Sequence, residues 1–245
     1  MSPPTHLTLE ILRQPDDETC GPTCLHAVYG FYGDRVPLDR VITEVTPLAT
    51  GGTLGAFLGL HALERGYRAT LYTYNLGLFD PSWFDEDPPR LVDRLREQAE
   101  VKPDPALQAV TGAYVEFLLR GGRVRFEELG PELIREHLMD GHPIMTGLSA
   151  TYLYDCPREV FAGGRSRYDS VRGSATGHFV VVHGYDPVTD SVLIADPLHD
   201  NPRYQSATYR VGIMRLLGAI LLGVLTYDAN LLVVEPDIPL AAGPA

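Results

Sequence analysis

Apolar residues at helical spacing dominate the first half of this chain, and strand-like runs dominate the last third. Helical spacing, bounded by Gly or Pro, predicts helices over residues 20–32, 37–45, 53–63 (with Thr53 as N-cap), 89–100, 105–120, 131–139 and 207–222. Alternating or continuous apolar runs predict strands at 7–12, 67–74, 124–126, 143–148, 177–186, 192–195 and 229–234. A Gly-, Ser- and Arg-rich stretch at 159–176 predicts a surface loop. Helices that gather early and antiparallel strands that gather late predict the α+β class.

Composition narrows the classes of function. The chain has 245 residues, of which 44% are apolar and 21% charged, as in an ordinary globular protein long enough for a large core. A net charge of −12 argues against nucleic acid as a partner. The longest apolar stretch, 216–225, is about half a membrane span, and residues 1–9 do not form a signal peptide. Three cysteines are too few for a disulfide framework, so we expect a reducing, cytoplasmic location.

The sequence 14–24 carries the first candidate chemistry. Gln14 stands six residues ahead of Cys20, and Cys20 begins a predicted helix. The positive end of the helix dipole favours the thiolate form of a cysteine in the first turn. The side-chain amide of Gln14 can lie beside the backbone N–H of Cys20, and two such donors form an oxyanion hole.

A second block lies far downstream. The strand predicted at 177–186 begins with His178. After a turn, the strand at 192–195 runs into Asp196 and a proline. A histidine can take the proton of a thiol, and a carboxylate can orient that histidine. The residue types of a nucleophile, a base and an orienting acid are therefore all present.

Together these two blocks resemble the papain-like cysteine peptidases. More closely, they resemble the peptidases that cut bacteriocin leader peptides after a double glycine, and their bacterial stand-alone relatives. The resemblance implies a papain-like fold, with the nucleophile in an N-terminal helical half and the His and Asp on a C-terminal antiparallel sheet. It implies Cys20 as nucleophile, His178 as base, Asp196 as the orienting acid and Gln14 as oxyanion donor.

The resemblance covers the two ends of the chain, roughly 9–74 and 131–235. The middle, about 75–128, resembles nothing that we can name. We therefore expect a single papain-like peptidase domain over 1–245, with a helical insertion at about 75–128. The transporter and ATPase regions to which some leader peptidases are fused have no counterpart in this sequence.

Other cysteines and histidines compete for these roles. Cys24 lies one helical turn after Cys20 and is expected to pack in the core, with a redox pair as the alternative. Cys156 is expected in a loop and inert. His183 should face away from His178 on the same strand, and His199 lies in a loop that could line the site.

Two acids compete with Asp196, and zinc competes with the thiol chemistry. Asp186 and Asp190 flank a predicted hairpin turn, where Asp is common for local reasons. A zinc site is the other interpretation of the cysteines and histidines, but the usual short ligand spacing is missing on both sides. We therefore expect no metal and no cofactor.

The primary hypothesis is a thiol hydrolase that cleaves a peptide or amide bond through a thioester. The same site could pass the acyl group to an amine or thiol, giving an acyltransferase or transpeptidase. A third alternative is a peptide-binding module without activity. In each case the expected partner is a peptide or amide substrate; the substrate's identity, partner proteins and oligomeric state stay open.

Overall fold

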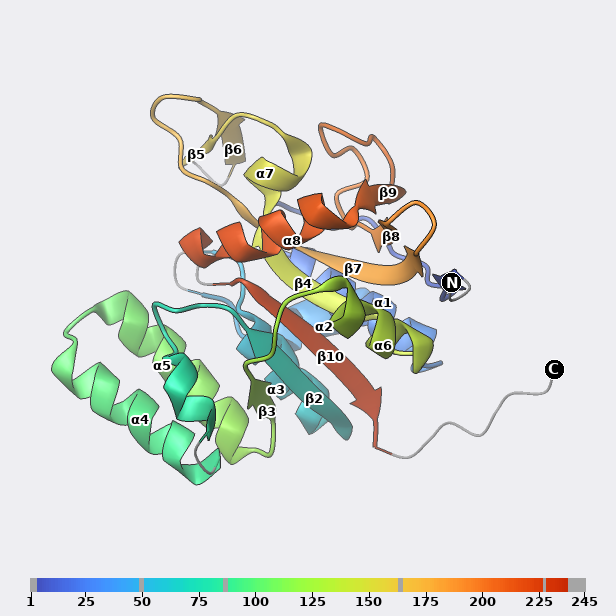
Figure 1. Ribbon diagram of the computed structural model, residues 1–245. Helices are drawn as coiled ribbons and strands as arrows, with labels where there is room; N and C mark the ends of the chain where they lie inside the picture. Colours follow the sequence, from blue (N-terminus) through green and yellow to red (C-terminus); the bar gives the residue numbers. More distant parts are fainter. Residues whose placement is uncertain (1–3, 49–50, 86–87, 163–164, 227, 238–245) are drawn as a thin grey trace.

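A mixed sheet forms the centre of the molecule and separates two groups of helices (Figure 1). The computed structural model describes residues 4–48, 51–85, 88–162, 165–226 and 228–237. Within them, the main sheet has eight strands in the order β3-β2-β10-β4-β7-β8-β9, with β1 paired to β7. Neighbouring strands are antiparallel except β2 and β3, which are parallel. The last strand in the sequence, β10, therefore lies inside the sheet, between β2 and β4.

The strands follow the chain in this order: β1 (Thr5–His6), β2 (Tyr67–Thr73), β3 (Arg123–Arg125), β4 (Ile144–Ser149), β5 (Glu159–Ala162), β6 (Arg165–Tyr168), β7 (Gly177–Asp186), β8 (Ser191–Ala195), β9 (Thr208–Gly212) and β10 (Asn230–Pro236). The α-helices are α1 (Cys20–Phe31), α2 (Leu38–Glu44), α3 (Gly55–Glu64), α4 (Pro88–Val101), α5 (Pro105–Leu119), α6 (Pro131–Met139), α7 (Ala150–Tyr154) and α8 (Ile213–Leu222). Two 3₁₀ turns, η1 (Pro81–Asp85) and η2 (Gly223–Thr226), complete the described elements. Strands β5 and β6 form a separate two-stranded hairpin.

The core is divided by the sheet into two parts. Along β10, Leu232 and Val234 pack with the helices α1 to α5, whereas Leu231 and Val233 pack with α6, α7 and α8. Successive side chains of a strand point to opposite faces, so a strand covered on both faces is apolar at every position. This explains why β7 and β10 contain continuous apolar runs, 179–182 and 231–234, instead of alternating positions.

Helices α4 and α5 pack against the same core as α1 and α3. The ring of Phe117 in α5 lies so close to Gly59 in α3 that a Cβ there would approach it to 2.5 Å. Phe79, Leu95 and Tyr114 are buried in the same cluster. The helices of the segment 75–128 are thus joined to the helical side of the sheet by continuous apolar packing.

The α+β class is confirmed, and most elements lie within two residues of their predicted bounds. Four predictions were wrong in detail. Residues 7–12 form no strand, and the two-residue β1 (Thr5–His6) lies just before them, because β4 pairs with β7 up to Val182 and leaves only a short stretch of β7 for another strand. Thr53 does not cap α3; Leu54 occupies that position, and the Thr53 hydroxyl donates to the Thr46 carbonyl at 3.0 Å.

The other two errors concern strands that were not predicted. The stretch at 159–176 contains the hairpin β5–β6, whose largely polar residues conceal its strand character. The predicted helix at 207–222 is a strand followed by a helix, with Gly212 at the junction. Within β9, Tyr209 and Val211 are buried while the residues between them are exposed, which is the period of a strand.

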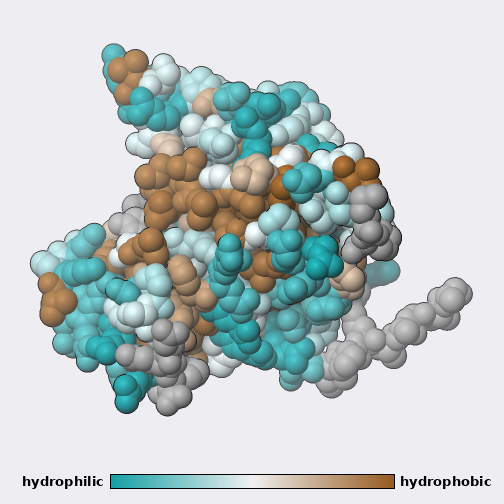
Figure 2. All heavy atoms as spheres, viewed as in Figure 1, coloured by the Kyte–Doolittle hydropathy of each residue, from teal (hydrophilic) through white to brown (hydrophobic). Residues whose placement is uncertain are grey.

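The outer face of α8 is apolar and exposed. Figure 2 shows apolar side chains gathered over this helix. Its exposed members in α8 and η2 include Met214, Leu221, Leu222, Val224 and Leu225. Within the described residues, no helix combines the length and the apolar character that crossing a bilayer requires.

Candidate active site

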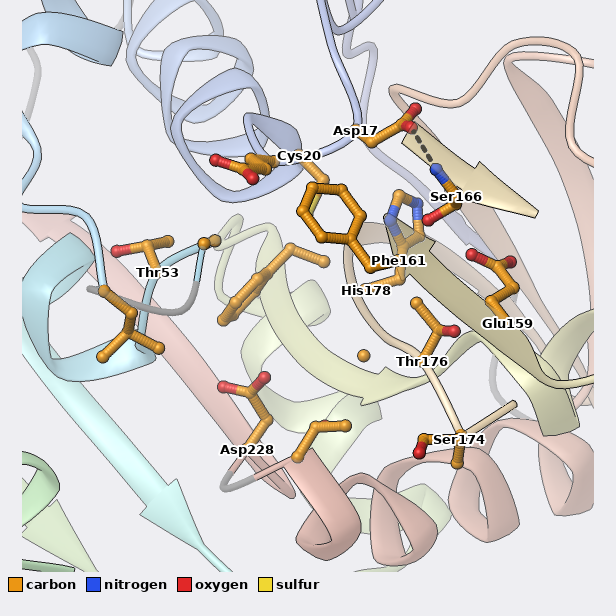
Figure 3. Close-up of a pocket in the computed structure, with 18 of the residues that line it drawn as sticks. Asp17, Cys20, Thr53, Glu159, Phe161, Ser166, Ser174, Thr176, His178 and Asp228 are labelled. Carbon is orange, nitrogen blue, oxygen red and sulfur yellow. Dashed lines mark hydrogen bonds between the residues drawn. The ribbon is translucent and has the colours of Figure 1, made fainter. Parts of the chain in front are cut away.

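Cys20 is the first residue of α1 and lies on the wall of a cavity (Figure 3). Pro22 is tolerated in the first helical turn, where backbone N–H groups have no partner within the helix. A Cβ at Gly21 would lie 2.6 Å from the Thr53 methyl, so glycine permits the close approach of the segment before α3. The free N–H groups of the first turn can stabilise negative charge on the Cys20 sulfur.

His178 lies near the start of β7 and faces the same cavity. Its side chain is buried, and its Nε2 lies 2.9 Å from Oδ1 of Asp196. Burial works against a charged ring, but the Asp196 carboxylate and a hydrogen bond with Cys20 raise the pKa of His178 to about 10. The imidazolium is therefore the stable form of His178 at neutral pH, as a thiolate–imidazolium pair requires.

The carboxyl of Asp196 is fully buried and has four hydrogen-bond donors. Its Oδ1 accepts from His178 and from the Leu198 backbone N–H, at 2.9 Å each. Its Oδ2 accepts from the hydroxyl of Tyr154, at 2.7 Å, and from that of Tyr209. Burial opposes ionisation, but the His178 ring and the two hydroxyls hold the pKa of Asp196 below its usual range. The carboxylate thus stays ionised and fixed against the histidine.

The topology of the sheet explains why His178 and Asp196 meet. Strands β7 and β8 are antiparallel neighbours in which Val181 pairs with Ala195. The start of β7 and the end of β8 therefore lie at the same edge of the sheet. Tyr209 comes from β9, which pairs with β8 on its other side.

Tyr154 and Tyr209 are site residues that the sequence analysis missed. Tyr209 was assigned to a helix, although its alternation with Val211 is a strand signal that could have corrected the assignment. Tyr154 ends the one-turn helix α7, and no local pattern relates it to Asp196 across 42 residues of chain.

Gln14 is placed near the other residues but is not among the described residues that line the cavity. Its backbone N–H donates to the Pro197 carbonyl at 3.0 Å, which joins the loop before Cys20 to the segment after Asp196. Its side-chain nitrogen donates to the Asp16 carbonyl at 2.7 Å, and its Oε1 is buried without a partner among the described residues. An amide nitrogen has two hydrogens, so one remains for another acceptor.

The competing cysteines lie in different environments. Cys24 is fully buried and donates to the Phe179 carbonyl at 3.3 Å, and burial raises its pKa well above the usual value. Cys156 is partly buried, and burial together with the Glu159 charge raises its pKa. Both thiols are thus disfavoured as thiolates, and neither lines the cavity.

The competing histidines and acids have local partners or lie away from Cys20. Nδ1 of His183 is 2.8 Å from the Leu7 carbonyl, beside β1. His199 does not line the cavity, and its Nε2 is buried without a partner among the described residues. Asp186 accepts from the Val188 backbone within the hairpin turn, and Asp190 accepts from the Tyr185 hydroxyl.

The cavity has a volume of about 550 Å³ and extends away from Cys20 and His178. Figure 3 shows these two side chains at one end and Asp228 at the other. Phe161 of the β5–β6 hairpin points into the space between its walls. The backbone N–H of Ser166 in this hairpin donates to Asp17, just before α1, at 3.2 Å.

Comparison with known proteins identifies the fold. Residues 131–213 match the model of the Peptidase_C39 like family. A C39-like peptidase from Bacillus anthracis is 14% identical with a TM-score of 0.52, over 95% of this chain and 98% of that one. No curated protein shows a significant sequence match.

Two further structures have TM-scores below 0.5. Xylellain, a cysteine protease from Xylella fastidiosa, is 15% identical with a TM-score of 0.46, over 97% of this chain and 87% of that one. A double-glycine motif protease from a transporter, in complex with its leader peptide, is 12% identical with a TM-score of 0.44, over 96% and 99%. The fold assignment therefore depends on the first structure and the family match. The resemblance inferred from the sequence is thus confirmed: the chain has the papain-like fold of the C39-like peptidases, and residues 131–213 match the model of the Peptidase_C39 like family.

Proposed function

We propose that this protein is a cysteine peptidase that cleaves a peptide or amide bond through a thioester. The observation that carries the proposal is that Cys20 and His178 lie together at one end of the cavity, with the buried Asp196 bonded to His178 behind them. Cys20 is a candidate nucleophile at the start of a helix, His178 is a base whose pKa is raised, and Asp196 is a buried, ionised acid.

In the proposed reaction, the Cys20 thiolate attacks the carbonyl carbon of the substrate. The backbone N–H of Cys20 and the second amide hydrogen of Gln14 stabilise the oxyanion that forms. His178 gives its proton to the leaving amine, and the thioester remains on Cys20. Water, deprotonated by His178, then hydrolyses the thioester and restores the thiolate–imidazolium pair. Asp196 keeps its negative charge throughout and stabilises the imidazolium.

The reactivity of the three cysteines tests this assignment directly. At about pH 6, iodoacetamide should label Cys20 far faster than Cys24 or Cys156, because burial raises the pKa of both other thiols. Mass spectrometry of tryptic peptides measures the sites and their rates. Preferential labelling of Cys24 or Cys156 would contradict the assignment of the nucleophile.

Gln14→Ala should lower kcat by about 100-fold and change KM little. One oxyanion-hole donor contributes on the order of 3 kcal/mol, mostly when negative charge develops in the transition state. Steady-state kinetics on a peptide substrate measures both constants. A raised KM with an unchanged kcat would instead assign Gln14 to substrate positioning. Gln108→Ala, an exposed amide on α5 outside the cavity lining, is the matched control.

We also propose that the whole chain forms one peptidase domain, with the segment 75–128 inserted beside the papain-like part. The burial of Phe117 and Tyr114 among residues of α1 and α3 supports this division. In this proposal the inserted helices complete the core on the helical side of the sheet instead of folding independently.

A further inference from the structure

Asp228 is a buried acid in the candidate active site that the proposed reaction does not use. It lies between η2 and β10, its exposed fraction is 5%, and its side chain lines the cavity at the end away from Cys20 (Figure 3). Strand β4 makes room for it, because a Cβ at Gly147 would lie 2.7 Å from the Asp228 Cβ. The fold therefore places this carboxyl at the floor of the cavity by close backbone packing.

The carboxyl of Asp228 has few partners. Among the described residues, its one hydrogen bond comes from Asn230 Nδ2 to Oδ1, at the long distance of 3.4 Å. Asp196, in the same protein and equally buried, receives four donors. A buried carboxylate without donors or a cation is costly, and burial accordingly raises the pKa of Asp228 to about 8, against the effect of Asn230.

The charged side chains around the cavity are mostly acidic. Asp17, Glu18 and Glu159 line it together with Asp228. Arg172, the arginine among the described lining residues, is largely exposed and pairs with Asp169 at 3.6 Å. Cavities lined by one sign of charge attract groups of the opposite sign. The missing partner of Asp228 is thus expected to be a cation supplied by the substrate.

We propose that Asp228 forms the floor of a subsite that accepts a basic side chain of the peptide substrate, Lys or Arg, and so determines specificity. This inference rests on the proposed peptidase function. When the ammonium or guanidinium enters, it pairs with the Asp228 carboxylate, whose free oxygen Oδ2 becomes its hydrogen-bond acceptor. A neutral side chain of the same length leaves the acid in its protonated form and gains no ion pair.

Matched peptide pairs test the subsite by catalysis. A peptide library should compare Lys with norleucine, and Arg with citrulline, at each position on both sides of the cleaved bond. At one position we expect kcat/KM to be about 10-fold or more higher for the basic residue, the range of a charge-assisted hydrogen bond. Asp228→Asn should reduce this ratio to about 1, whereas Glu159→Gln at the rim should keep most of it. Equal rates for the matched peptides, or an undiminished ratio in Asp228→Asn, would overturn the proposal.

A binding measurement separates this proposal from the proposed reaction. In the Cys20→Ala variant, Nα-acetyl-lysine amide should shift the NMR signals of the Gly147 and Asn230 backbone amides, and Nα-acetyl-norleucine amide should not. The lysine-dependent shifts should disappear in Cys20→Ala/Asp228→Asn, whose fold is checked by its remaining signals. If the wild type cleaves peptides but Cys20→Ala shows no lysine-dependent shifts, the subsite is contradicted and the peptidase function is not. Binding without cleavage by the wild type would contradict the peptidase function and support the subsite.

Discussion

Replacing Cys20 by alanine is expected to lower kcat/KM by about 10⁴-fold or more, the largest effect of any single substitution in this chain. The variant keeps the cavity and the His178–Asp196 pair but has no nucleophile to form the thioester. Cleavage of a fluorogenic peptide measures the loss. Acid-quenched wild-type enzyme should also show an acyl adduct on Cys20 by mass spectrometry, which the variant cannot form.

Cys156→Ala is the matched control for this experiment. Like Cys20, it is a partly exposed residue, but it lies outside the cavity lining. We expect kcat/KM within about twofold of the wild type, as for a surface substitution. Retained turnover in Cys20→Ala would contradict the proposed mechanism, and it would leave the cavity as a binding site for peptides.

Asp196→Asn is expected to lower kcat by about 10³- to 10⁴-fold and to move the high-pH limit of activity toward neutrality. The active form requires a protonated His178, whose pKa of about 10 depends on the Asp196 charge. Without that charge, only the interaction with Cys20 still raises the pKa of the ring, and burial lowers it. The high-pH limit should therefore shift downward: wild-type activity should persist to about pH 10, and the activity of Asp196→Asn should decline at a lower pH. The pH dependence of kcat/KM measures both limits.

Tyr209→Phe serves as the control for the charge of Asp196. It removes one of four donors to Asp196 but keeps the carboxylate and its bond to His178. Because the charge that raises the pKa of His178 is kept, we expect a high-pH limit close to that of the wild type and a modest loss in kcat. A high-pH limit in Asp196→Asn that equals the wild-type limit would show that Asp196 does not control the protonation of His178.

Local signals in the sequence were sufficient for part of this structure. The helix start at Cys20 and the helix α6, with Pro131 at its beginning, are predicted because the preference of proline for the first helical turn acts within a few residues. The strand that presents His178 is predicted because burial on both faces makes it apolar throughout.

The remaining features depend on contacts between distant segments. Nothing near Tyr154 in the sequence shows that its hydroxyl reaches Asp196, since the contact follows from how α7 and β8 pack. The contacts of Asp228 likewise depend on Gly147 of β4, a strand far away in the chain. The β5–β6 hairpin is held by backbone pairing, and its sequence shows little apolar alternation. Its composition therefore indicated only a loop.

The position of β10 has a consequence for the order in which this protein folds during its synthesis. Because β10 lies between β2 and β4, the sheet consists of two unconnected parts until residue 236 has left the ribosome. Until then, the segments that carry Cys20 and Asp228 lack the strand that fixes the cavity floor. We therefore expect a growing polypeptide to acquire the peptidase activity proposed above only after β10 has been synthesised.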